Sequence, residues 1–256
     1  MSKCIFCKLE SVKKSIEHII PESFGNKSYI LKNGCVCDKC NNRFSKFEST
    51  ALSNTVFVME RARLGAESKK GKSAKGKVGE LTIEGDKDLK PEIITVKGLN
   101  SKNVRNYDPK TKTFQLVVQT FDDSDVATSK MLLKIGLEAI YKSQKLIYFI
   151  SNFKILKSYL LSEDNNDWPF LTTDIETKKF RNIPHLFTKK KLIQIHCVLK
   201  FTMLNRNTLL FKFKYGSVSM LINLLSRDLD WIKEFKKVDT KAVLYPAHFI
   251  TKLEKK

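Results

Sequence analysis

Two pairs of cysteines near the start of the chain have the spacing of metal ligands. Cys4 and Cys7 form one Cys-x-x-Cys pair, and Cys37 and Cys40 form the second. Each pair presents two thiolates from a tight turn, and two such turns complete the four soft ligands of a closed tetrahedral zinc site. The segment between the pairs is longer than the roughly 15 to 20 residues usual in a zinc ribbon. We therefore expect a structural zinc ion that closes a loop large enough to hold other functional residues.

There are two alternatives to this assignment: Cys35 as a ligand, and disulfide bonds in place of zinc. Cys35 lies just before Cys37, but the spacer between Cys37 and Cys40 repeats that of the first pair, so we assign Cys35 to the interior. A pair of disulfides would suit a secreted chain, but residues 1–20 lack the apolar run and cleavage site of a signal peptide. Zinc is therefore the preferred interpretation.

The loop between the cysteine pairs contains residues suited to phosphodiester hydrolysis. Glu17 and His18 are adjacent, and Asn41 and Asn42 directly follow the second cysteine pair. Hydrolysis needs a base that activates water and a cation that stabilises the charge of the transition state. The imidazole of His18 can accept a proton near pH 7. Glu17 and Asn41 offer the hard oxygen atoms that magnesium and manganese prefer.

Together, residues 4–7, 17–26 and 37–43 resemble the HNH endonuclease family, in its zinc-containing branch with a Glu-His-Ile-Ile-Pro signature. The resemblance covers about residues 1–56. It implies a ββα-metal fold, in which a hairpin carries the catalytic histidine and a helix carries the last ligand of one divalent cation. Glu17 and Asn41 would then hold Mg²⁺ or Mn²⁺, with Asn42 as the rival to Asn41.

The chain departs from the family pattern in two places. The metal-binding acid of the family is most often aspartate and the last position is often histidine, where this chain has Glu17 and Asn41. The middle asparagine of the motif orients the histidine loop through hydrogen bonds, and either Asn33 or Asn26 could take this role. We prefer Asn33, which lies just before the second cysteine pair. A non-catalytic zinc module that binds nucleic acid is the alternative interpretation.

The charge of the chain favours a polyanionic partner. With 47 Lys and Arg against 27 Asp and Glu, the formal net charge is +20, which attracts nucleic acid. The family resemblance makes double-stranded DNA the leading substrate. No run of about 18 apolar residues and no lipidation motif is visible, so we expect a soluble, cytoplasmic protein that does not bind membranes. The oligomeric state stays open.

We expect the fold class to be α+β, with a small zinc-braced ββα-metal domain at residues 1–60 followed by a larger mixed α+β domain at residues 79–256. The basic segment 61–78 reads as a flexible linker because its glycines and serines suit a helix interior poorly. The residues expected to contact nucleic-acid phosphates are Arg43, Lys69, Lys70, Lys72, Lys75 and Lys77.

The sequence of the larger domain predicts secondary-structure elements, but it resembles no second family. Strands are expected at residues 81–83, 93–96 and 112–119, and helices at about 126–145 and 147–161. Further strands are expected at 192–202, 209–215 and 218–225. We expect this domain to recognise the target or to regulate the nuclease, for example as a sensor of a ligand or partner. A chain of this layout could serve in restriction or phage defence.

Overall fold

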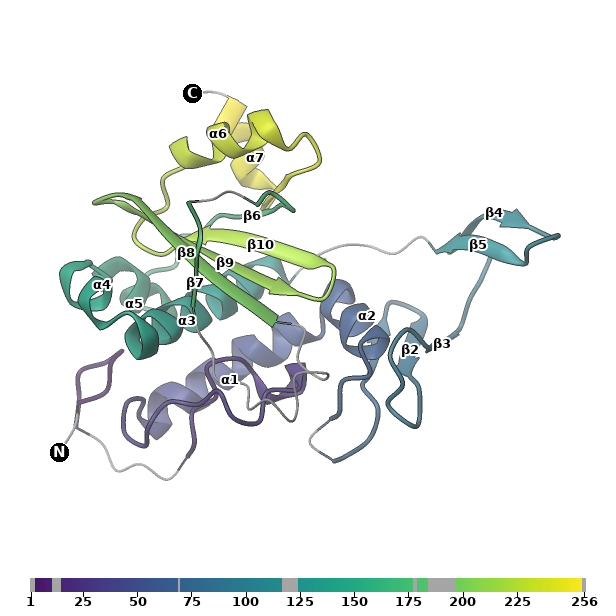
Figure 1. The fold of residues 1–256 in the computed structure, drawn as a ribbon, viewed down its shortest axis with the longest axis horizontal. Helices are drawn as coiled ribbons and strands as arrows, with labels where there is room; N and C mark the ends of the chain where they lie inside the picture. The colour runs from purple at the N-terminus through teal and green to yellow at the C-terminus, as the bar shows by residue number, and fades with distance from the viewer. Residues whose placement is uncertain are drawn as a thin grey trace.

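The structure, a computed structural model, describes residues 3–10, 15–68, 70–116, 124–176, 179–183 and 197–254. Helices are combined with antiparallel sheets, which confirms the α+β class (Figure 1). In chain order the elements are η1 (Glu22–Phe24), α1 (Asp38–Leu52), α2 (Thr55–Arg63), β1 (Lys75–Val78), β2 (Leu81–Gly85), β3 (Ile94–Lys97), β4 (Val104–Asp108), β5 (Thr113–Leu116), α3 (Asp125–Ser143), α4 (Lys145–Ile150), α5 (Lys154–Leu160), β6 (Phe170–Thr172), β7 (Arg181–Asn182), β8 (Cys197–Asn205), β9 (Thr208–Tyr215), β10 (Val218–Asn223), α6 (Asp230–Val238), β11 (Val243–Tyr245) and α7 (His248–Glu254).

Side chains that cap the helix starts define the two N-terminal helices. Cys37 is the N-cap of α1, where its Sγ accepts from the Cys40 N–H at 3.4 Å. Asn54 caps α2, and its side chain accepts from the Val56 N–H at 2.8 Å. Such caps satisfy backbone donors that have no partner within the helix. The first cap therefore fixes the start of α1 at the second cysteine pair.

The expected linker over residues 61–78 differs from the structure. The end of α2 and the strand β1 lie in this segment, and β1 pairs with β2 in a three-stranded antiparallel sheet that β3 completes. A Cβ atom at Gly76 would lie 2.7 Å from the side chain of Val58, so the glycine lets β1 pack closely on α2. The small residues that suggested flexibility therefore allow close packing.

A six-stranded antiparallel sheet forms the centre of the C-terminal part, in the order β11-β6-β10-β9-β8-β7. The expected strands at 209–215 and 218–225 are confirmed as β9 and β10, and that at 192–202 overlaps β8, although residues 192–196 lie outside the described part. Gly216, at φ 59°, forms the tight turn between β9 and β10. Alternate residues of β9 face opposite sides: Phe211 packs toward α3, and Leu210 packs with α6 and α7.

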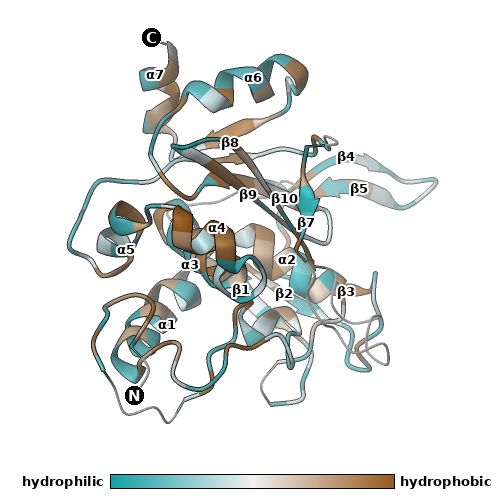
Figure 2. Ribbon diagram, turned by 60° about the vertical axis from the view of Figure 1, so that its left-hand side comes forward, coloured by the Kyte–Doolittle hydropathy of each residue, from teal (hydrophilic) through white to brown (hydrophobic). Residues whose placement is uncertain are grey.

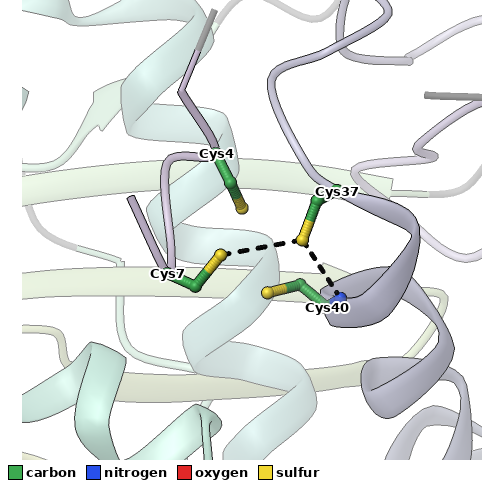
Figure 3. Close-up of side chains that lie close together, drawn as sticks. All are labelled: Cys4, Cys7, Cys37 and Cys40. Carbon is green, nitrogen blue, oxygen red and sulfur yellow. Dashed lines mark hydrogen bonds between the residues drawn. The ribbon is translucent and has the colours of Figure 1, made fainter. Parts of the chain in front are cut away.

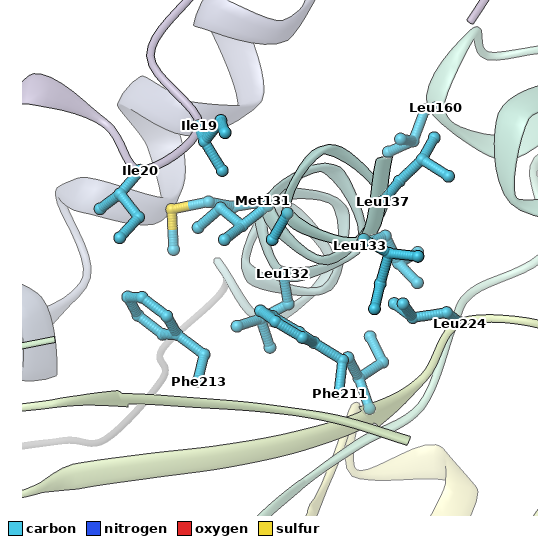
Figure 4. Close-up of a cluster of buried hydrophobic side chains, with 14 of the residues drawn as sticks. Ile19, Ile20, Met131, Leu132, Leu133, Leu137, Leu160, Phe211, Phe213 and Leu224 are labelled. Carbon is cyan, nitrogen blue, oxygen red and sulfur yellow. The ribbon is translucent and has the colours of Figure 1, made fainter. Parts of the chain in front are cut away.

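Helix α3 lies between this sheet and the N-terminal segment (Figure 4). Met131 lies on the side of Ile19 and Ile20, whereas Leu132 and Leu133 lie toward Phe211 and Leu224 of the sheet region. The hydrophobic residues gather where α3 meets the sheet, while the β4–β5 hairpin projects from the body and is largely hydrophilic (Figure 2). One continuous core therefore runs from the cysteine pairs through α3 into the sheet.

The expected helix at 126–145 corresponds to α3, while the one at 147–161 is divided into α4 and α5. The expected strands near 81–83, 93–96 and 112–116 correspond to β2, β3 and β5, and residues 117–119 lie outside the described part. Among the described residues, no helix has both the length and the apolar character needed to cross a membrane.

Candidate functional site

The four cysteines of the two pairs meet at one point (Figure 3). The Sγ atoms of Cys4, Cys7, Cys37 and Cys40 all lie within 4.8 Å of one another. The first pair lies on a turn closed by the Lys8 N–H, which donates to the Cys4 carbonyl at 3.0 Å. The second pair lies on the first turn of α1. The structure thus brings together the four ligands that the sequence predicts.

The chemistry of this donor set fits a zinc ion. All six cysteines of the chain are free thiols. A hydrogen bond with Cys40 lowers the pKa of Cys4 to about 4, and the same pair, followed by burial, raises the pKa of Cys40. The two pKa shifts are opposite because the surrounding thiols stabilise the thiolate of Cys4, while Cys40 keeps its proton. A bound cation would stabilise the thiolate form of all four cysteines. Cys35 lies outside the cluster, with its Sγ 3.9 Å from the Tyr141 hydroxyl.

His18 lies on a short antiparallel hairpin that precedes α1. It pairs with Ile30 in an isolated bridge, and next to it the Leu31 N–H donates to the Glu17 carbonyl at 2.9 Å. The hairpin and the helix that follows it have the order of a ββα unit. The side chain of Glu17 is buried, whereas that of His18 is half-buried.

Of the two asparagines considered for the middle position, Asn26 contacts the backbone of the hairpin, whereas the preferred candidate Asn33 does not lie among these contacts. Asn26 is fully buried, and its amide nitrogen donates to the Ile20 and Tyr29 carbonyls at 2.6 and 3.0 Å. Its oxygen accepts from the Tyr29 N–H at 2.8 Å. Asn33 is exposed on a turn. A buried amide that bridges the two sides of the loop fixes the hairpin, which an exposed side chain does not do.

A cavity of about 550 Å³ connects the hairpin with one face of α1. Glu17 and His18 line it from the hairpin, and Asn41, Ser45 and Glu48 line it from the helix. These three helix positions lie on one face because their spacing follows the helical repeat. Asn42 is exposed and does not line the cavity. The geometry therefore favours Asn41 over Asn42 as a metal ligand.

A buried ion cluster lies next to this cavity, and sequence analysis did not predict it. Lys134 of α3 is 1% exposed, and its Nζ lies 2.5 Å from Glu17, 2.9 Å from Glu48 and 3.4 Å from Glu138. The same ammonium donates to the backbone carbonyl of His18 at 2.9 Å. One cation thus joins the hairpin, α1 and α3.

The cluster has more acids than bases, and this sets the protonation of its members. Burial raises the pKa of Glu138 well above its usual range, and the charge of Glu17 adds to that rise. Burial also raises the pKa of Glu17, against the attraction of Lys134. Although burial acts to lower the pKa of Lys134, the three carboxylates raise it well above the ordinary value. Among the described residues, Oε2 of Glu17 has no hydrogen-bond partner, so it remains available to a cation.

Basic side chains that follow the family motif in the sequence also line this cavity. Arg61, Lys75 and Lys77 belong to its wall, and no carboxylate of the described part forms an ion pair with Arg61. Burial lowers the pKa of Arg61, and its buried Nε has no hydrogen-bond partner among the described residues. Sequence analysis missed Arg61, which appeared only as one charge within a basic run.

The other residues expected to contact phosphates lie elsewhere. Lys70 and Lys72 are exposed and do not line the cavity, and Lys69 lies outside the described residues. Arg43 lies on α1 and donates to the carbonyl of Leu161.

Comparison with protein families matches residues 4–57 to the model described as HNH endonuclease. The match spans the cysteine cluster, the His18 hairpin and α1, and it ends within α2. Residues 4–57 therefore match the HNH endonuclease family, which indicates a function related to nucleic acid for this segment. Comparisons with the curated proteins and with the solved structures found no match.

We predict that Cys37→Ser removes the metal while preserving the cap of α1, because serine is a preferred N-cap residue. Structural zinc contributes on the order of 10 kcal/mol to small modules. Since the cysteines share one core with α3 and the sheet, the whole chain should lose thermal stability. Elemental analysis and thermal unfolding measure both effects. Cys35→Ser is the matched control and should keep its zinc; wild-type protein with far less than one zinc ion per chain would disprove the assignment.

We predict that Lys134→Met destabilises the protein by about 3 to 5 kcal/mol near neutral pH, because it removes one partner of a buried ion pair. Without the lysine, the remaining buried carboxyls would have folded-state pKa values above the usual 4.5. Their contribution to the free energy of unfolding is fully present below pH 4.5 and is lost as the pH rises through the folded-state pKa. The deficit relative to wild type should therefore shrink between pH 7.5 and pH 5 in urea unfolding.

Lys130→Met is the control for this prediction. Lys130 lies on the same helix, with its Nζ over the ring of Tyr159 at 4.8 Å. Its loss should change stability little and give no comparable pH dependence. An equal effect of both substitutions at both pH values would contradict the role of the cluster.

Proposed function

We propose that the protein is a metal-dependent endonuclease that hydrolyses phosphodiester bonds of nucleic acid, with double-stranded DNA as the leading substrate. The observation that carries the proposal is the convergence of Glu17, His18 and Asn41 on one cavity inside the segment that matches the HNH endonuclease family. Restriction or phage defence is the biological role that we propose for such an activity.

The residues of the cavity fit a divalent cation. Glu17 has an oxygen without a hydrogen-bond partner among the described residues, and Asn41 offers an amide oxygen, both hard ligands. Glu48 lines the same cavity and adds a third oxygen donor that sequence analysis did not single out. A bound Mg²⁺ or Mn²⁺ would stabilise the charge that develops on the phosphate and the leaving oxygen.

The protein's own side chains supply the remaining steps. His18 accepts the proton of the attacking water, and the hydrogen bond from Lys134 to its backbone carbonyl fixes the position of the residue. Arg61, Lys75 and Lys77 line the cavity and bind the phosphates of the substrate. Because Arg61 has no carboxylate partner in the described part, it can bind an anion without first breaking an ion pair.

We predict that His18→Ala slows cleavage by about 10²- to 10⁴-fold, the usual contribution of a general base. DNA affinity should stay unchanged, since the base acts on water and not on the bound substrate. Plasmid cleavage under single-turnover conditions with and without magnesium, together with a binding titration, measures both. His248→Ala, at a partly exposed position of α7, is the control and should cut at the wild-type rate. Cleavage by His18→Ala at that same rate would leave a non-catalytic binding module as the better explanation.

We predict that replacing Lys75 and Lys77 by Gln flattens the dependence of log affinity on log salt. Each phosphate contact contributes nearly one unit to this slope, so a loss of about one to two units is expected. Lys70→Gln with Lys72→Gln removes the same charge from positions outside the cavity wall and should change the slope less. Binding titrations at several salt concentrations test this; parallel lines for wild type and the Lys75/Lys77 variant would exclude direct contact.

A further inference from the structure

A second cavity, of about 660 Å³, lies on the other flank of α1. Cys7 and Cys40 of the cysteine cluster form part of its wall, and α4 and α5 supply the opposite side. None of the residues that line it lines the His18 cavity. The two cavities are therefore separate sites that share one helix.

The second cavity concentrates positive charge. Its basic lining consists of Lys8, Lys39, Arg43, Lys154 and Lys157. The single acid in the lining, Glu163, accepts a hydrogen bond from the Ser158 hydroxyl at 3.2 Å. Within the described part of the chain, none of the five basic residues forms an ion pair with a carboxylate. Uncompensated cations around a concave site attract an anion.

Two of these cations are close to each other. Burial, and then the neighbouring Lys8, lower the pKa of Lys157 to about 8. The Nζ of Lys157 also contacts the Tyr148 hydroxyl at 3.1 Å, which holds the lysine at the cavity wall. Adjacent ammonium groups repel one another, and an anion between them would convert the repulsion into attraction.

A zinc ion bound by the four cysteines would account for part of this positive charge at most. A zinc ion with four thiolates carries two negative charges, and Lys8 and Lys39 flank its ligands in the sequence. Lys154 and Lys157, however, come from α5, and Arg43 lies a turn further along α1. Positive charge therefore remains in excess in the cavity.

Aromatic side chains provide a surface next to these cations. Tyr148, Phe149 and Phe153 line the cavity; Tyr148 and Phe153 are buried, whereas Phe149 is 74% exposed although it is large and apolar. The rings of Tyr148 and Phe153 are stacked with centroids 5.6 Å apart. The exposed ring of Phe149, beside lysine and arginine side chains of the cavity, is suited to a base joined to a phosphate.

We propose that this cavity binds a phosphate-bearing ligand of nucleotide chemistry, either a free nucleotide or a nucleotide of a nucleic-acid strand. The phosphate lies among the lysines, and the base packs on the exposed ring of Phe149. The proposal does not depend on cleavage, because the site shares no lining residue with the His18 cavity.

Calorimetric titration of the full chain carrying His18→Ala tests the proposal without any contribution from cleavage. The probes are adenosine 5′-monophosphate, inorganic phosphate and a short single-stranded oligonucleotide, all at one ionic strength. We expect saturable binding of the nucleotide or the oligonucleotide. Because the oligonucleotide would also bind at the His18 cavity, only the binding that is weakened by Lys154→Gln with Lys157→Gln is assigned to this site. For that binding, equal affinities of nucleotide and oligonucleotide identify a free-nucleotide site, whereas a tighter oligonucleotide identifies a strand-binding site.

Lys154→Gln combined with Lys157→Gln should weaken this binding about tenfold or more, because a charge-assisted hydrogen bond contributes more than a neutral one. Lys236→Gln with Lys237→Gln, on α6, removes the same charge outside the cavity and should change affinity less than about twofold. Zinc content is measured for each protein.

Three results would overturn the proposal. The first is no saturable binding of any probe at millimolar concentration. The second is equal weakening by the two double variants, which would reflect net charge alone. The third is loss of zinc from the Lys154/Lys157 variant with unchanged affinity for the probes, which would assign these cations to the metal centre.

Discussion

The ion cluster around Lys134 is the interaction on which the rest of the candidate active site depends. A charged group that is removed from water must be paired, and here one ammonium is surrounded by three carboxylates and a backbone carbonyl. Because Glu17 belongs to the hairpin, Glu48 to α1 and Lys134 to α3, the ion fixes three elements relative to one another. The position of His18 follows from this geometry.

The same helix that carries this ion also forms the centre of the fold. Helix α3 has the ββα unit on one side and the sheet on the other (Figure 4). At Gly136 the helix approaches the sheet so closely that a Cβ atom would lie 2.7 Å from the side chain of Leu224. Helix α3 therefore carries both the packing contacts of the core and the lysine of the ion cluster. The N-terminal segment shares this core and is not packed as a separate body.

The parts that could be predicted from the sequence are those fixed by short-range spacing. The cysteine cluster follows from two tight turns, and α3, β9 and β10 follow from hydrophobic pattern over a few residues. The family resemblance adds the hairpin and helix around His18. These features need no knowledge of distant contacts.

What could not be predicted depends on which side chains become buried together. Lys134 and His18 are 116 residues apart in sequence, and a lysine within an apolar helix pattern does not reveal its partners. From the sequence we preferred Asn33 to Asn26, whereas in the structure Asn26 is buried and Asn33 is exposed. The basic segment 61–78 was misread because glycine permits both flexibility and close packing, and only the neighbouring Val58 decides between them at Gly76.

The distribution of the ion cluster over distant segments also limits how the segment 4–57 can be exchanged between proteins. Residues 4–57 match a family model as a unit, yet two of their carboxylates find their cation on α3. A recombination event that moved this segment to another chain would transfer the acids without the lysine. Transfer would succeed only where the recipient offers a cation at the same place, so the segment and α3 are expected to be inherited together.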